Sequence, residues 1–65
     1  MNDATLARVP KLLLTPEDAA LQLSISRTRV YDLIRCGDLA SVRIGRVRRI
    51  PVAALAAYVE RLQLE

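Results

Sequence analysis

The sequence contains no histidine, no phenylalanine and no tryptophan, and it has one cysteine among 65 residues. The absence of histidine excludes imidazole acid–base catalysis and imidazole metal ligation, and a single cysteine excludes a cysteine-rich zinc site. Cys36 cannot form a disulfide within the chain, and we expect it to be a buried or half-buried packing residue. We therefore expect a protein that is not an enzyme and needs no cofactor or metal.

Long apolar segments and glycine-rich loops are also missing. The two glycines, Gly37 and Gly45, form no phosphate-binding loop. No apolar run is long enough to cross a bilayer, and no stretch has the layout of a signal peptide. These absences predict a cytoplasmic protein that does not bind membranes.

The chain is long enough for one small domain. Apolar residues make up 52% of it, which is typical of a globular protein. A chain of this size buries only about 60% of the surface that it exposes when unfolded, so the core must be small. Residues 1–10 are expected to be a flexible lead, and residues 11–65 the folded domain, with Lys11 to Leu14 extended against its core.

Positive charge is concentrated in the middle of the chain. Residues 26–49 hold seven arginines and two aspartates, a net charge of +5, whereas the chain as a whole has a net charge of +3. The remaining residues therefore have a net charge of −2. Such a concentration indicates a polyanionic partner.

The basic stretch begins with a helix predicted over Ser26 to Cys36. Ser26 is a good N-cap, and Gly37 suits a left-handed residue at the C-terminal end. Val30, Leu33 and Ile34 have the spacing of a buried stripe. The opposite face and its flanks carry Arg27, Thr28, Arg29, Tyr31, Asp32 and Arg35.

A shorter helix is predicted just before it. Thr15 is an N-cap, Pro16 suits the first helical position, and Glu17 and Asp18 complement the positive helix end. This helix runs to Leu23, with Ala19 and Ala20 toward the core. The connection Ser24-Ile25 is so short that the two helices must cross steeply, as in a helix-turn-helix.

The second half of the chain predicts a β-hairpin and a third helix. Val42 and Ile44 alternate with arginines, and Gly45-Arg46 supplies the turn. Two registers remain open: a two-residue turn pairs Ile44 with Val47, and a three-residue loop places Arg48 and Ile50 on the face of Ile44. From Pro51 a helix is predicted whose core stripe is Val52, Leu55, Val59 and Leu62.

Three blocks of sequence together resemble the excisionase-type DNA-binding proteins, a family with a winged helix-turn-helix similar to the MerR group. The blocks are Leu13 to Ala20, Ile25 to Leu39, and Val42 to Pro51. The resemblance implies a mainly α fold with a small β-hairpin wing. It also implies a function as a recombination directionality factor of a phage or mobile element, in the cytoplasm of a bacterial host.

The resemblance places the helix Ser26 to Cys36 in the DNA major groove and Arg46 in or beside the adjacent minor groove. The predicted DNA-binding residues are Ser26, Arg27, Thr28, Arg29, Tyr31, Arg35, Arg43, Arg46, Arg48 and Arg49. The chain departs from the family pattern at Ser24, Asp32 and Arg48. Asp32 could accept a hydrogen bond from cytosine N4, or brace Arg29 or Arg35.

We therefore expect double-stranded DNA as the partner, with cooperative binding near an attachment site to promote integrase-mediated excision. An integrase and neighbouring copies of the chain on DNA are further candidate partners. One alternative is a small transcription regulator that uses the same winged helix-turn-helix. Another is a protein-interaction module that works through the alanine-rich third helix.

Overall fold

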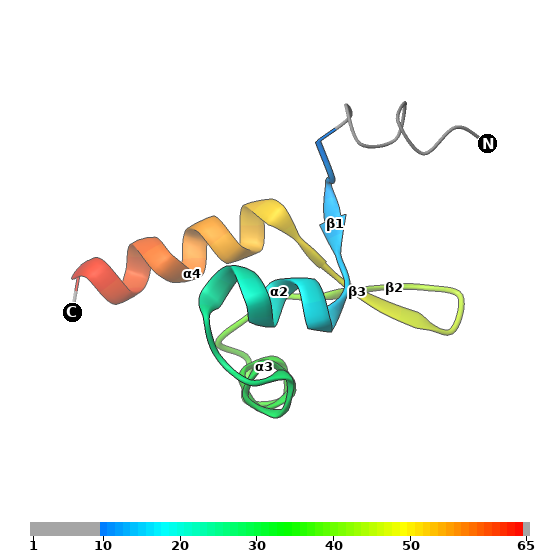
Figure 1. Cartoon of the computed structure of the whole chain (residues 1–65), viewed down its shortest axis with the longest axis horizontal. Coiled ribbons are helices and arrows are strands. Elements are labelled where there is room, and N and C mark those ends of the chain that lie inside the picture. The colour runs from blue at the N-terminus through cyan, green and yellow to red at the C-terminus, as the bar shows by residue number, and fades with distance from the viewer. Residues whose placement is uncertain (1–9, 65) are drawn as a thin grey trace.

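The computed structural model describes residues 10–64, so the predicted lead at residues 1–10 lies outside the described residues apart from Pro10. Figure 1 shows the arrangement of the three helices and three strands in this part of the chain. In chain order they are β1 (Leu13–Leu14), α2 (Pro16–Leu23), α3 (Arg27–Arg35), β2 (Val42–Ile44), β3 (Val47–Pro51) and α4 (Val52–Leu64). The predicted helix-turn-helix with a small β-hairpin wing is confirmed. Within residues 10–64, no helix is both long and apolar enough to cross a membrane.

Helix α2 begins as its sequence predicts. The Thr15 side chain accepts a hydrogen bond from the Asp18 backbone N–H at 3.0 Å, and Pro16 is the first helical residue. Asp18 also forms an ion pair with Lys11, at 3.1 Å between Nζ and Oδ2. This pair ties the approach to β1 to the first turn of α2.

The turn between α2 and α3 depends on one left-handed residue. Ser24 has φ 59° and ψ 42°. Its N–H bonds the Leu21 carbonyl at 3.2 Å, and the Ile25 N–H bonds the Ala20 carbonyl at 3.0 Å. These two bonds form a Schellman motif, in which glycine is the usual left-handed residue. Ile25 packs against the core, so the chain reverses within two residues.

Helix α3 has well-defined ends. The Ser26 side chain accepts from the Arg29 N–H at 3.1 Å. At the other end Gly37, with φ 86°, donates to the Ile34 carbonyl at 3.1 Å, and Asp38 donates to the Leu33 carbonyl at 2.9 Å. A second Schellman motif therefore ends α3, as Gly37 predicts.

The three strands form an antiparallel sheet in the order β1-β3-β2. In the hairpin of β2 and β3, which we call the wing, Ile44 pairs with Val47. The two-residue turn is therefore the register that forms, with Gly45 at φ 62°. Glycine adopts this positive φ without steric cost.

The predicted start of the third helix at Pro51 is wrong by one residue. Pro51 is the last residue of β3 and pairs with Leu13, and α4 begins at Val52. Proline has no N–H for the sheet, but the Val52 N–H reaches the Leu12 carbonyl at 3.0 Å. The strand therefore keeps its connection to β1 at this point. Of the predicted extended segment Lys11 to Leu14, only Leu13–Leu14 forms a strand. Leu12 does not pack against the core, because its side chain is 82% exposed.

One small core joins the elements, and it contains no large aromatic side chain. Its largest fully buried side chains are Val30 of α3, Ile50 of β3 and Leu39 of the loop after α3. Leu14, Ala19, Ala20 and Leu55 complete the buried cluster, while Leu33 and Ile34 pack against it partly exposed. The sheet, α2, α3 and α4 thus meet at a single point.

The predicted core stripe of α4 is only partly right. Leu55 is buried, but Val52, Val59 and Leu62 are exposed, and Ala54 and Tyr58 pack against the core instead. Figure 1 shows the reason, because α4 extends away from the rest of the fold beyond its first turns. The apolar spacing is helical, but the rest of the fold is too small to cover the whole length of α4.

The left-handed conformation of Ser24 makes a testable prediction. A Cβ in this conformation approaches the backbone carbonyl, so Ser24→Gly should raise the free energy of unfolding by about 1 kcal/mol. Ser24→Val should lower it, because a β-branched side chain fits this region worst. Urea denaturation measures both. Ser24→Ala is the matched control for loss of the hydroxyl and should change stability by less than about 0.5 kcal/mol. A destabilising glycine would contradict the interpretation.

A second prediction concerns pH. The hydrogen bond from the Lys11 ammonium lowers the pKa of Asp18 below its ordinary value of 3.8, opposed in part by desolvation and aided by Thr15. Because the pKa is lower in the folded state, the stability that the carboxylate contributes is present above pH 3.8 and is lost as the pH falls through the folded value. Asp18→Asn should lower Tm at pH 7, and the difference should vanish well below pH 3.8. Thermal melts followed by circular dichroism test this, and an undiminished difference at low pH would refute it.

Candidate nucleic-acid interface

The predicted binding residues of α3 lie on its surface. Those that the structure leaves exposed are Ser26, Arg27, Thr28, Arg29, Tyr31 and Arg35. They share the helix with Val30, which is fully buried, so the buried and exposed faces are separated as the sequence predicts. Packing on α2 therefore turns a polar, basic face of α3 to solvent.

Arg27 is held by two contacts at the start of α3. Its Nε lies 2.7 Å from Oε2 of Glu17 on α2, and its guanidinium lies 5.3 Å from the centre of the Tyr31 ring. The first contact is an ion pair and the second a cation–π interaction. The sequence alone predicts Glu17 only as a complement to the positive end of α2. The ion pair was missed because it joins residues that only the turn brings together.

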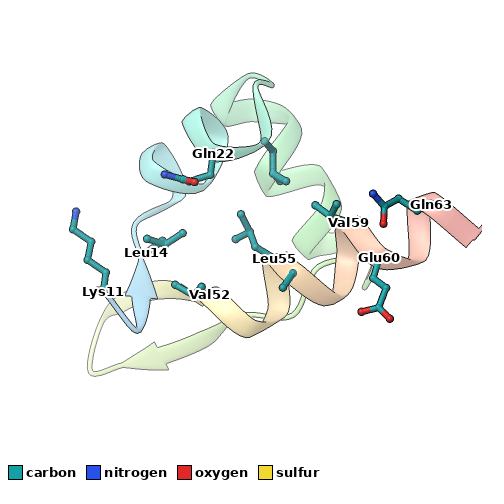
Figure 2. Close-up of a pocket in the computed structure, with 10 residues that line it drawn as sticks. Lys11, Leu14, Gln22, Val52, Leu55, Val59, Glu60 and Gln63 are labelled. Carbon is teal, nitrogen blue, oxygen red and sulfur yellow. The ribbon is translucent and has the colours of Figure 1, made fainter. Parts of the chain in front are cut away.

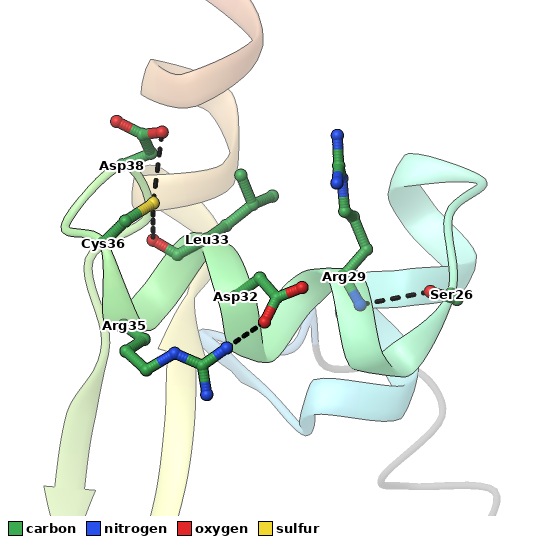
Figure 3. Close-up of polar contacts among 7 residues, drawn as sticks. All are labelled: Ser26, Arg29, Asp32, Leu33, Arg35, Cys36 and Asp38. Atoms are coloured by element: carbon green, nitrogen blue, oxygen red, sulfur yellow. Dashed lines mark hydrogen bonds and ion pairs between the residues drawn. The ribbon is translucent and has the colours of Figure 1, made fainter.

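Arg35 is held from its own helix. Figure 3 shows its guanidinium donating to the carboxylate of Asp32, three residues earlier. Of the three roles considered for Asp32, the structure therefore shows the bracing of Arg35. The side chain of Arg35 is still 75% exposed, so most of its donors remain available to a ligand.

The wing carries four arginines in two different environments. Arg43 and Arg46 are exposed, with Arg46 in the turn. Arg48 and Arg49 are half-buried. Arg48 Nη1 donates to Ser41 Oγ at 2.7 Å, and Arg49 Nη1 donates to the Arg48 carbonyl at 2.9 Å. Arg48 thus ties the segment before β2 to β3.

The register also decides which wing residues share a face. Arg43 pairs with Arg48, whereas Val42, Ile44 and Val47 occupy the opposite face together with Arg49. Arg48 is two residues from the buried Ile50, so the Arg43 and Arg48 face continues the core side of the sheet. Like charges directly opposite each other repel, so this face is suited to an anion.

The distribution of ion pairs leaves a large net positive charge. Among the described residues, arginine ion pairs are made by Arg27 and Arg35. The arginines of α3 and the wing that make none within residues 10–64 are Arg29, Arg43, Arg46, Arg48 and Arg49. They lie on α3 and on the wing, and Figure 1 shows the wing projecting away from α4. The surface of α3 and the wing, which we call the basic surface, therefore offers five arginines without an ion-pair partner among the described residues.

Cys36 lies outside this set, and the expectation that it packs in the core is wrong. It is exposed at the end of α3, where Sγ lies 3.4 Å from Oδ2 of Asp38 and 3.7 Å from the Leu33 carbonyl. The left-handed Gly37 turns the chain at this point and leaves the thiol outside. Within residues 10–64, no group of three or more metal-ligating side chains gathers closely enough to hold a metal ion.

A second surface feature is an apolar groove between α2 and α4. Its volume is about 880 Å³, and Figure 2 shows Leu14, Leu55 and Val59 on its walls. Lys11, Gln22, Glu60 and Gln63 are polar residues that line it as well. No residue of the basic surface lines the groove. The two features are therefore separate.

Comparison with known proteins gives relatives that match most of the chain. A helix-turn-helix domain family matches residues 13–63. A probable excisionase of Saccharopolyspora erythraea is 52% identical over 56 residues, which are 85% of this chain and 57% of that protein. An excisionase of Streptomyces ambofaciens is 43% identical over 51 residues, which are 78% of this chain and 81% of that protein. No solved structure gives a significant match.

The match extends from β1 to nearly the end of α4, so it includes α3, the wing and the turn between α2 and α3. The chain covers little more than half the length of the Saccharopolyspora relative and about four fifths of the Streptomyces relative. The chain belongs to the excisionase-type family of helix-turn-helix domain proteins.

Proposed function

We propose that the protein is a DNA-binding excisionase that binds near the attachment site of a phage or mobile element and promotes excision by an integrase. The observation that carries the proposal is the basic surface, where five arginines of α3 and the wing have no ion-pair partner within residues 10–64. Concentrated positive charge of this kind is the electrostatic footprint of a nucleic-acid partner. The names of the two relatives support excision over the alternative of transcription regulation.

The geometry suits a two-part contact with duplex DNA. Helix α3 has nine residues and a length of about 14 Å. The major groove of B-DNA is about 12 Å wide and admits such a helix. Figure 1 shows the wing projecting from the sheet on the side away from α4. We propose that α3 enters the major groove while Arg46 at the wing turn reaches the neighbouring minor groove or its phosphates.

The remaining residues of the basic surface divide by role. Ser26, Arg27 and Thr28 at the start of α3 are proposed to fix the helix on the DNA backbone, where phosphate contacts set register. Tyr31 and Arg35 project from the exposed face toward base edges. Arg29, Arg43, Arg48 and Arg49 supply further charge. The protein itself supplies binding energy, and the bond chemistry belongs to the integrase.

Binding by so small a basic surface is expected to need help from neighbouring copies on repeated sites. Cooperative assembly would place several weakly bound domains side by side and fix the path of the DNA. The integrase then meets DNA whose geometry favours excision. We propose both the cooperativity and the integrase partnership as parts of the excisionase function.

The first prediction for this function concerns salt. If about five phosphates are neutralised, log K should fall with log salt concentration at a slope near −4.5. Arg46→Gln should weaken binding to all duplexes alike and reduce the magnitude of the slope by about 1. Fluorescence anisotropy on a duplex from the attachment region measures this.

Gln63→Glu is the matched control, because it makes the same change of net charge on α4, in the groove rather than on the basic surface. It should leave the slope unchanged. Equal effects of the two variants would show that only net charge matters and would contradict a specific role for Arg46.

The second prediction concerns recombination. In a reconstituted reaction with the integrase of the same element, adding the protein should raise the yield of excised product. Arg46→Glu should abolish the rise, because it reverses the charge at the wing turn. Gel shifts on the same DNA should show stepwise cooperative complexes. Unchanged excision at protein concentrations that saturate the DNA would favour transcription regulation instead.

A further inference from the structure

An acidic side chain stands in the exposed face of α3, where the proposed ligand is a polyanion. Asp32 is half-buried, with 43% of its side chain exposed, between the exposed Tyr31 and Arg35. On a face that meets DNA phosphates, a carboxylate lowers affinity for every sequence. Its presence on the binding face therefore needs a compensating role.

The contact made by Asp32 suggests that role. The carboxylate accepts a hydrogen bond from Nη2 of Arg35, one helical turn away. The Schellman motif at Gly37 holds the end of the helix directly after Arg35. Figure 3 shows the Arg35 guanidinium bent back toward Asp32 and the Arg29 side chain directed away from it. Among the described residues, Arg29 has no ion-pair partner.

We propose that Asp32 is a positioning residue that holds the Arg35 guanidinium ready to read a G·C base pair, so that it determines sequence specificity. The inference rests on the proposed DNA-binding function and deepens it. A guanidinium has five N–H donors in a rigid fork, and one ion pair leaves the others free. The commonest specific contact in the major groove is an arginine that donates to O6 and N7 of guanine.

Asp32 thereby lowers the affinity for DNA in general and raises the preference for the correct sequence. On DNA without the correct base pair, its carboxylate repels phosphates and Arg35 gains no base contact. On the correct sequence the guanidinium is already oriented, so less side-chain entropy is lost on binding. Arg29 lacks such a brace and is suited to phosphate contacts that carry no sequence information.

The experiment selects bound duplexes from a pool with a randomised 20-base-pair segment and compares four proteins: wild type, Asp32→Asn, Arg35→Gln and the double variant. Wild type should enrich a motif that contains one strongly preferred G·C pair. Asp32→Asn and Arg35→Gln should both lose the preference at that same base pair, by a factor of at least about five. The double variant should lose no more than either single variant, because the two residues act as one unit.

Asp38→Asn is the matched control. Asp38 follows α3, and its carboxylate lies near the Cys36 thiol rather than near Arg35. The Asp38→Asn variant changes the net charge by the same amount as Asp32→Asn, and it should keep the wild-type motif. On a fixed duplex without the motif, Asp32→Asn should bind more tightly than wild type, whereas Arg35→Gln should bind more weakly. A change of fold alone would weaken both.

Three results with the variants would overturn the inference: an unchanged motif in Asp32→Asn, loss of preference at different base pairs in the two single variants, or loss of the motif in Asp38→Asn. These results differ from failure of the proposed function. If wild type shows no salt-dependent binding to any duplex, the DNA-binding proposal itself fails. If wild type binds duplex DNA without enriching any motif, DNA binding stands and the role of Asp32 in specificity is refuted.

Discussion

The close packing of α3 on α2 is the contact on which the rest of the structure depends. Ala19 is completely buried and Ala20 nearly so, in the same cluster as Val30 of α3. Small side chains let the two helices approach closely, and the left-handed Ser24 lets the chain reverse between them. Once Val30 is buried, the helical period turns the opposite side of α3 to solvent. The orientation of the proposed reading face follows from packing on its other side.

Electrostatics complete what packing begins. The acids near α3 do not simply neutralise its arginines, because each pair also fixes a guanidinium in place. Glu17 and Tyr31 hold Arg27 at the start of the helix, and Asp32 holds Arg35 near its end. Exposed ion pairs contribute little to stability. Under the proposed function, their larger effect is to order side chains that would otherwise lose entropy on binding DNA.

The strands of the wing contribute residues both to the core and to the basic surface. Near β1 the strand β3 contributes Ile50 to the core, and toward the turn it carries arginines. Because side chains alternate along a strand, Arg43 and Arg48 continue the core face beyond the core itself. The hydrogen bond from Arg48 to Ser41 ties the segment before β2 to β3. Strand pairing and this bond hold the wing in place without a larger core.

Local chemistry in the sequence was enough to predict where α2 begins and where α3 begins and ends. Ser26, Pro16 and Gly37 mark helix ends through backbone hydrogen bonds that involve only neighbouring residues, and all three lie where predicted. The concentration of arginine in residues 26–49 is likewise a property of the sequence. Tertiary structure decided the hairpin register, the exposure of Cys36, the start of α4 at Val52 and the open groove beside it. It also decided which acid pairs with which arginine, because distances between residues of different elements depend on how those elements pack.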